Sequence, residues 1–213
     1  MLYSAFRAAF WIFTHLVCRY RVRGREYVPM KGPLLIIANH LSWYDPILLG
    51  VVLPRRVWYF TKIEIFRWPI VGLLGRLTGQ IPVHRGAHDH EALEKGLAYV
   101  REGKAVMIFP EGAVEKQGRM LPAHTGTALL AVRTGVPVLP IALCGTRRIL
   151  RSFRIWLPDV YVQIGKPFIP FLPPGVSHKA GLQCIAEDMM TRIAEMLPKE
   201  QRGLYRKIEP PNV

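Results

Sequence analysis

The sequence predicts an α/β fold in which helices cover both faces of a mixed, largely parallel sheet. Short apolar runs alternate with helical patterns of about 10 to 15 residues, as in chains whose strands are joined by crossover helices. Several runs are apolar without a break, which is typical of strands buried on both faces. A chain of 213 residues can bury roughly 70 per cent of its unfolded surface. We therefore expect an amphipathic N-terminal helix at residues 1–24 and a single α/β domain at residues 25–213.

The N-terminal segment, residues 1–24, is the most hydrophobic long stretch. A signal peptide would begin with basic residues, whereas the arginines here follow the apolar block. A spanning helix needs about 20 apolar residues, and Arg7, Thr14 and His15 interrupt this shorter block. On a helix these polar residues form a narrow stripe, so we expect the helix to lie in a membrane interface. Packing of the same helix on the domain core is the alternative.

Six apolar segments after residue 30 are predicted to form strands, at residues 33–39, 56–62, 79–85, 104–110, 136–145 and 160–168. Helical patterns lie between or after them at residues 45–53, 90–102, 125–135 and about 178–197, and a glycine-interrupted helix separates the second strand from the third. Asp45 before Pro46 fits a helix start, and Asp89 fits the N-cap of the helix that Gly103 ends. No repeat or long linker divides the chain.

The composition indicates an anionic partner. Lys plus Arg exceed Asp plus Glu by 29 to 15, giving a net charge of +14, yet half of the chain is hydrophobic and the mean hydropathy is +0.16. That combination favours a membrane phospholipid surface over nucleic acid, and no helix-turn-helix, RNP or KH signature is present. The arginine-rich segment 145–156 suits anionic headgroups or a CoA phosphate. Three scattered cysteines indicate neither a disulfide framework nor a zinc site, and hence a reducing, cytoplasmic setting.

Polar side chains follow three of the predicted strands, where function gathers in α/β folds. His40 and Asp45 come after the first strand, Arg85 ends the third, and Glu111 comes after the fourth. Each has an ordinary structural explanation, because an aspartate before a proline starts helices and a glutamate in a Pro-Glu-Gly turn can accept backbone amides. Their joint occurrence in order favours a catalytic site.

Four segments in sequence order resemble the motifs of the glycerolipid acyltransferase family, typified by 1-acyl-sn-glycerol-3-phosphate acyltransferase, also called lysophosphatidic acid acyltransferase. They are "NHLSWYD" (39–45), "QIPVHRG" (80–86), "FPEG" (109–112) and "VPVLP" (136–140). The resemblance runs from about Gly32 to Gly145, around half of the chain. It implies a glycerol-3-phosphate acyltransferase-like fold and an acyltransferase domain over residues 25–213.

The resemblance also implies a reaction. A fatty acyl group would pass from acyl-CoA or acyl carrier protein to the free hydroxyl of a lysophospholipid, most simply 1-acyl-sn-glycerol-3-phosphate, giving phosphatidic acid. His40 would be the general base and Asp45 would orient it. The residues implied in substrate binding are Asn39, Lys62, Arg85, Glu111 and Gly112. No cofactor or metal is implied, and the expected location is the cytoplasmic face of the cell membrane, peripheral or monotopic.

Two departures from the family pattern keep other acceptors open. Ala113 and Val114 stand where relatives often have Thr-Arg, and Ala123-His124 stands where they often have Phe-Lys. Lys116 or Arg119 could compensate for the missing arginine. Another lysolipid or lipid alcohol is therefore an alternative acceptor, and a thioesterase or lipid esterase would use the same base with water. A noncatalytic lipid-binding or nucleic-acid-binding protein is the third class.

One crowded segment carries possible metal ligands without the spacing of a known metal site. Its members are His84, His88, Asp89, His90 and Glu91. They straddle a loop and a predicted helix start, so we expect no metal there.

Overall fold

The protein is described here from a computed structural model that places residues 2–84, 89–115, 117–149 and 157–206. These residues form a seven-stranded sheet in the order β1-β7-β6-β2-β5-β3-β4. The strands are β1 (Arg19–Arg23), β2 (Leu34–Ala38), β3 (Val57–Lys62), β4 (Ile81–Val83), β5 (Ala105–Ile108), β6 (Val138–Cys144) and β7 (Asp159–Ile164). All neighbouring pairs are parallel except β6 with β7. The predicted mixed, largely parallel sheet is confirmed.

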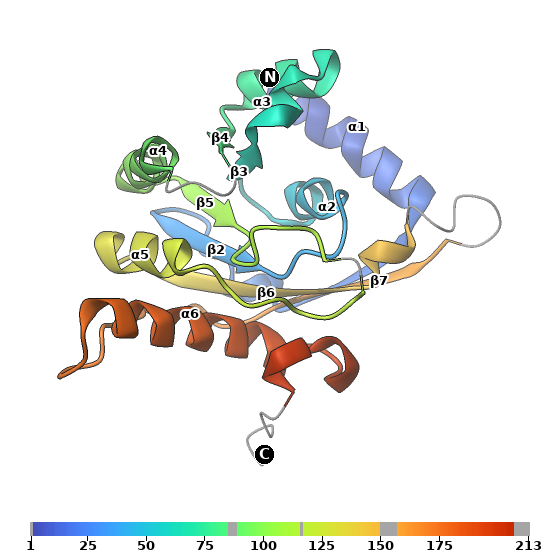
Figure 1. Cartoon of the computed structure of the whole chain (residues 1–213). Coiled ribbons are helices and arrows are strands. Elements are labelled where there is room, and N and C mark those ends of the chain that lie inside the picture. Colours follow the sequence, from blue (N-terminus) through green and yellow to red (C-terminus); the bar gives the residue numbers. More distant parts are fainter. Residues whose placement is uncertain (1, 85–88, 116, 150–156, 207–213) are drawn as a thin grey trace.

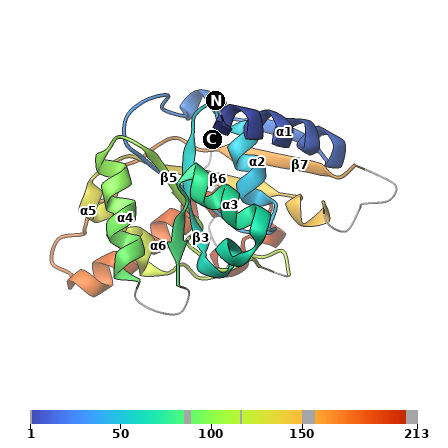
Figure 2. The ribbon, with the colours of Figure 1, turned by 90° about the horizontal axis from the view of Figure 1, so that it is seen from above.

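Helices cover the sheet on both faces (Figure 1). They are α1 (Leu2–Val17), α2 (Asp45–Val52), α3 (Pro69–Thr78), α4 (His90–Arg101), α5 (Thr125–Thr134) and α6 (His178–Glu195). The alternate side chains of β2 divide the core in two. Leu34 and Ile36 pack with α2 and the end of α1, whereas Leu35 and Ile37 pack with α4, α5 and α6. Seen from above, α1, α2 and α3 lie on the near side of the sheet (Figure 2).

The N-terminal segment is not one helix up to residue 24, so the predicted boundary is wrong. Helix α1 ends at Val17, and residues 19–23 form β1, which pairs in parallel with β7. The physical reason is the alternation Arg-Tyr-Arg-Val-Arg, whose period of two is that of a strand. Tyr20 and Val22 pack against the core, while the three arginines are exposed. The arginines therefore belong to the edge of the sheet.

Helix α1 packs on the domain through Arg7 and Thr14 of its polar stripe. The Arg7 guanidinium donates to the carbonyls of Val51 and Leu53 at the end of α2, and the Tyr44 hydroxyl donates to Thr14 Oγ1. Four large apolar side chains of this helix are exposed: Trp11, Ile12, Phe13 and Leu16. The helix thus contacts the domain and still presents an apolar surface. No helix among residues 2–84, 89–115, 117–149 and 157–206 is both long and apolar enough to cross a membrane.

Two strands differ most from their predicted bounds. The segment predicted at residues 79–85 is a strand only over Ile81–Val83, because Gly79 ends α3 in the left-handed conformation at φ 73°. The segment predicted at residues 160–168 leaves the sheet after Ile164, and Phe168 then makes a single bridge to Val138. Both corrections lie at the ends of elements and leave the sheet unchanged.

Candidate active site

The histidine and aspartate of the first polar loop face each other. The loop follows β2, and α2 begins at Asp45. His40 Nδ1 lies 2.9 Å from Asp45 Oδ2, with only 5 per cent of the histidine side chain and none of the aspartate side chain exposed. Because an aspartate carboxylate only accepts hydrogen bonds, Nδ1 carries the proton and donates it. In the neutral imidazole this leaves the lone pair on His40 Nε2, as a general base requires.

Asp45 does not act as the N-cap that the sequence suggests. Tyr44 occupies the capping position, and Asp45 is the first residue of α2. Its Oδ2 accepts hydrogen bonds from the backbone N–H groups of Leu41 at 2.7 Å and Ser42 at 2.8 Å, both of which precede it. The carboxylate thus folds the loop back onto itself. The same atom then fixes the orientation of the imidazole.

Glu111 is a support for the backbone of His40. Its Oε1 accepts from the His40 N–H at 3.1 Å, and its Oε2 accepts from the Leu121 N–H at 3.0 Å. Only 3 per cent of Glu111 is exposed. Burial raises the pKa of this carboxyl to about 7, although the two backbone amides act in the opposite direction. Each carboxylate oxygen is thus held by a backbone N–H group, and the substrate contact that the resemblance implies for Glu111 stays a prediction.

Asn39 is likewise structural. Its side-chain amide donates to the Leu143 carbonyl at 3.0 Å, and its side-chain oxygen accepts from the Leu143 N–H at 2.7 Å. The residue is fully buried. Asn39 therefore ties the end of β2 to β6, and the substrate contact that the resemblance implies for it stays a prediction.

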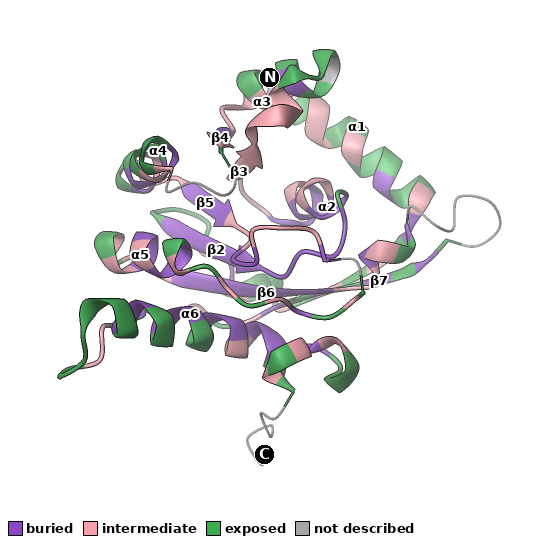
Figure 3. Ribbon diagram, in the orientation of Figure 1, coloured by how far each residue is buried: buried purple, intermediate pink, exposed green. Residues whose placement is uncertain are grey.

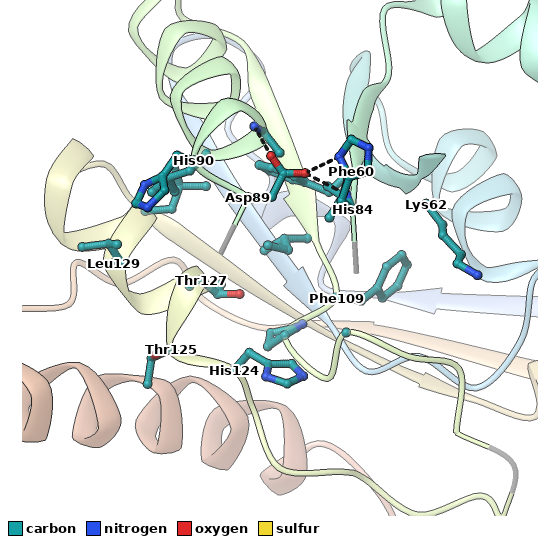
Figure 4. Close-up of a pocket in the computed structure, with 18 residues that line it drawn as sticks. Phe60, Lys62, His84, Asp89, His90, Phe109, His124, Thr125, Thr127 and Leu129 are labelled. Atoms are coloured by element: carbon teal, nitrogen blue, oxygen red, sulfur yellow. Dashed lines mark hydrogen bonds and ion pairs between the residues drawn. The ribbon is translucent and has the colours of Figure 1, made fainter. Parts of the chain in front are cut away.

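A cavity of about 500 Å³ lies beside the His40–Asp45 pair. Figure 4 shows its walls, which come from β3, β4, the start of α4, the turn after β5 and the start of α5. Lys62 and Gly112, two of the predicted substrate-binding residues, are in the lining, whereas His40 and Asp45 are not. Phe109 connects the cavity to the His40–Asp45 pair. It lines the cavity and also stacks on the His40 ring, with the ring centroids 4.0 Å apart and the planes at 15°.

Gly112 is required by its close neighbour in the cavity wall. Its φ of 66° is in the left-handed region, and a Cβ there would lie 2.8 Å from the Cδ2 atom of His124. The sequence singled out His124 only as a departure from the family pattern. The structure adds it to the site, since it lines the cavity opposite Lys62 and His84 (Figure 4).

Lys62 stands at the end of β3, where its Nζ lies 3.1 Å from Glu64 Oε1. Arg85, the arginine predicted to bind the acceptor, lies outside the described residues, as do Lys116 and His88. The arginine-rich segment 145–156 is described only as far as Ile149. Of the two basic residues that the resemblance implies in substrate binding, Lys62 and Arg85, the structure describes Lys62.

His84 and Asp89 form a second pair at the cavity mouth. Asp89 caps α4 by accepting from the Ala92 N–H at 3.0 Å, and its other oxygen accepts from the His84 N–H at 2.7 Å. His84 Nδ1 lies 3.2 Å from the same oxygen. Within the part of the chain that the structure describes, no three His, Cys, Asp or Glu residues are grouped closely enough to hold a metal ion. The pair accordingly serves as a helix cap.

Comparison with known proteins matches this chain to acyltransferases. The family model named Acyltransferase matches residues 19–144, which include the His40–Asp45 pair and Glu111. The chloroplastic 1-acyl-sn-glycerol-3-phosphate acyltransferase BAT2 of Brassica napus is 31 per cent identical over 182 residues, covering 83 per cent of this chain and 50 per cent of that protein. The lyso-ornithine lipid O-acyltransferase of Pseudomonas aeruginosa is 33 per cent identical over 114 residues, covering 53 per cent of this chain and 43 per cent of that protein.

A solved structure has the same fold. The 1-acyl-sn-glycerophosphate acyltransferase PlsC from Thermotoga maritima superposes with a TM-score of 0.71 at 24 per cent identity, covering 87 per cent of this chain and 75 per cent of that one. The present chain spans half or less of the length of the Brassica napus and Pseudomonas aeruginosa relatives.

Proposed function

The chain belongs to the acyltransferase family, and from that premise we propose that it moves a fatty acyl group from a thioester donor to the free hydroxyl of a lysolipid. The donor is acyl-CoA or acyl carrier protein. The observation that carries the proposal is the His40–Asp45 pair, which is joined through the Phe109 ring to a cavity of about 500 Å³. Neither a metal nor another cofactor is needed, because the thioester is already activated.

The chemistry follows from the protonation state of the pair. His40 Nε2 takes the proton from the acceptor hydroxyl as its oxygen attacks the thioester carbonyl. The carbon–sulfur bond then breaks, and the imidazolium returns the proton to the departing thiolate. Asp45 stabilises the imidazolium through Nδ1. A positioned base of this kind contributes about 10²- to 10⁴-fold, or about 3 to 5 kcal/mol of the barrier.

We propose 1-acyl-sn-glycerol-3-phosphate as the acceptor, with phosphatidic acid as the product. Lys62 supports this choice, because it lines the cavity and an ammonium can bind a phosphate. A lysolipid with an amino-acid headgroup is the second candidate. It is favoured by the similarity to the lyso-ornithine lipid O-acyltransferase of Pseudomonas aeruginosa.

We also propose that the enzyme works on a membrane phospholipid surface, at the cytoplasmic face. The exposed apolar side chains of α1 support this part of the proposal, since Trp11, Ile12 and Leu16 are 51 to 69 per cent exposed. An interfacial position would give the cavity direct access to lipid substrates.

The test is a mass-spectrometric assay of the purified full chain. Acyl-CoA and acyl carrier protein are each supplied with lysophosphatidic acid, with lyso-ornithine lipid, or with no acceptor. We expect an acylated lysolipid, and we expect His40→Ala to lower its rate by at least 10²-fold. His178→Ala is the matched control, because His178 is exposed at the start of α6. Release of free fatty acid at an unchanged rate with and without acceptor would instead identify a hydrolase.

A further inference from the structure

Helix α3 is an outlying helix in which two of the three leucines, Leu73 and Leu77, are exposed. Its main neighbour is the preceding 3-10 helix η2 (Ile63–Arg67). Glycines form the contact, since a Cβ on Gly72 would lie 2.2 Å from the Phe66 carbonyl oxygen and one on Gly75 would lie 2.9 Å from the Phe66 ring. The larger side chains are therefore left outside, with Leu73 52 per cent and Leu77 50 per cent exposed.

The exposed surface of α3 has the chemistry of a membrane-interface helix. Trp68, directly before the helix, is 66 per cent exposed, and Val71 adds to the apolar face. The helix sequence contains no acidic residue, and the side chains of Arg67 and Arg76 at its two ends are exposed. Apolar residues flanked by tryptophan and arginine are typical of helices that lie in the interface of an anionic bilayer.

We infer that α3, together with Trp68 and the two flanking arginines, is a second membrane-contact element whose partner is an anionic lipid bilayer. A protein partner is the less favoured occupant, because the arginines complement anionic headgroups and the surface is a single convex helix. The inference rests on the proposed function for its biological purpose, since a lysolipid acceptor resides in that bilayer.

Helices α1 and α3 lie at the same end of the molecule, where Figure 3 shows both to be largely exposed. Arg56 links them. Its guanidinium donates to the carbonyl of Thr78 at the end of α3 at 2.8 Å and lies 5.1 Å from the centroid of the Tyr3 ring in α1. Two linked contacts fix the tilt of a protein on a surface, which a single helix cannot do. Lys62 in the cavity wall is followed directly by η2, which packs against α3. Contact of α3 with the bilayer would therefore also keep the cavity wall close to the lipid.

The experiment measures flotation of the full chain with vesicles of phosphatidylglycerol and phosphatidylcholine in equal parts. The test variant carries Trp68→Ser, Leu73→Ser and Leu77→Ser. The matched control carries Ile169→Ser, Phe171→Ser and Val176→Ser, which also removes three exposed apolar side chains, from the loop before α6. That helix covers the opposite side of the sheet from α1 (Figure 1). We expect the test variant to bind at least tenfold more weakly and the control to bind as the wild type does.

Equal binding by the test variant and the wild type, or an equal loss in the control, would overturn the inference. Loss of a dimer in analytical ultracentrifugation, with vesicle binding unchanged, would assign α3 to contact between two copies of the chain. A short-chain, monomeric lysolipid separates this inference from the proposed function. The test variant should acylate it at the wild-type rate, whereas absence of acyl transfer in the wild type would refute the proposed function and leave the flotation result standing.

Discussion

The base is held from several directions at once. Asp45 binds the His40 side chain, and Glu111 accepts a hydrogen bond from the His40 backbone N–H. The His40 carbonyl accepts from the Glu115 N–H at 2.8 Å. Phe109 stacks on the ring. Such restraint fixes Nε2 before a substrate arrives, which lowers the reorganisation needed in the transition state.

Replacing Asp45 by Asn should remove most of the activity while the helix start is kept. An asparagine offers one oxygen acceptor, and it cannot balance an imidazolium charge or enforce the proton on Nδ1. We expect the rate of acyl transfer to fall at least 10²-fold. The comparison is Asp188→Asn, which alters an exposed ion pair on α6 and should keep wild-type activity. Comparable rates in the two variants would contradict the assigned role of Asp45.

Glu111 should make stability depend on pH. Its pKa in the folded protein is about 7, above its ordinary value of 4.5, because it is buried. The folded state therefore binds the extra proton between these values, and the free energy of unfolding falls as pH rises through 7. We expect the free energy of unfolding to fall by up to about 3 kcal/mol between about pH 5 and pH 8. Urea unfolding at both pH values measures this change. Glu111→Gln should abolish it, whereas Glu187→Gln, an exposed change on α6, should leave it in place.

At the scale of elements, β1 is the strand that joins α1 to the sheet. Its register pairs Arg21 with Tyr161 and Val22 with Val162 of β7. Val22 packs against the core, whereas Arg21 is exposed. The strand thus anchors the helix that precedes it, so any membrane contact made through α1 is transmitted to the sheet.

This register predicts opposite outcomes for adjacent substitutions. Val22→Asp would place an unpaired carboxylate against the core and should lower the free energy of unfolding by about 2 kcal/mol or more. Arg21→Asp introduces the same side chain on the exposed face and should change it by no more than about 0.5 kcal/mol. Urea unfolding of both variants checks the strand, and equal effects would mean that residues 19–23 do not alternate as described.

At the scale of the whole molecule, the parallel strands bring distant loops to one edge of the sheet. The loop after β2 carries His40, the turn after β5 carries Glu111, and β3 ends at Lys62. Because β2, β5 and β3 are neighbours and run in the same direction, these residues meet at the carboxyl ends of the strands. Open α/β sheets bind their ligands at this edge.

The net charge of +14 makes a further prediction about the intact protein. Attraction between exposed arginines or lysines and anionic headgroups is screened by salt. Binding to phosphatidylglycerol-containing vesicles should weaken at least tenfold when sodium chloride is raised from about 0.05 M to about 0.5 M. Binding to pure phosphatidylcholine vesicles should change little. An equal salt effect on both vesicles would exclude an electrostatic contribution.

The sequence by itself determined the features that depend on neighbours along the chain. Unbroken apolar runs such as residues 34–38 give buried strands, and the His-x4-Asp spacing across a strand end and a helix start brings His40 and Asp45 together. The helix cap at Asp89 is equally local. Each of these contacts spans only a few residues, so short-range geometry is sufficient to place it.

Only the tertiary structure decided the roles that depend on distant partners. Glu111 reaches His40 across 71 positions, and Asn39 reaches Leu143 across 104, so both side chains support the chain around the base through distant partners. The alternation at residues 19–23 suits a strand, but only the pairing of β1 with β7 places that strand in the sheet. The physical reason is that strand order and burial arise from packing of the whole chain, and packing decides whether a polar side chain is free to bind a ligand.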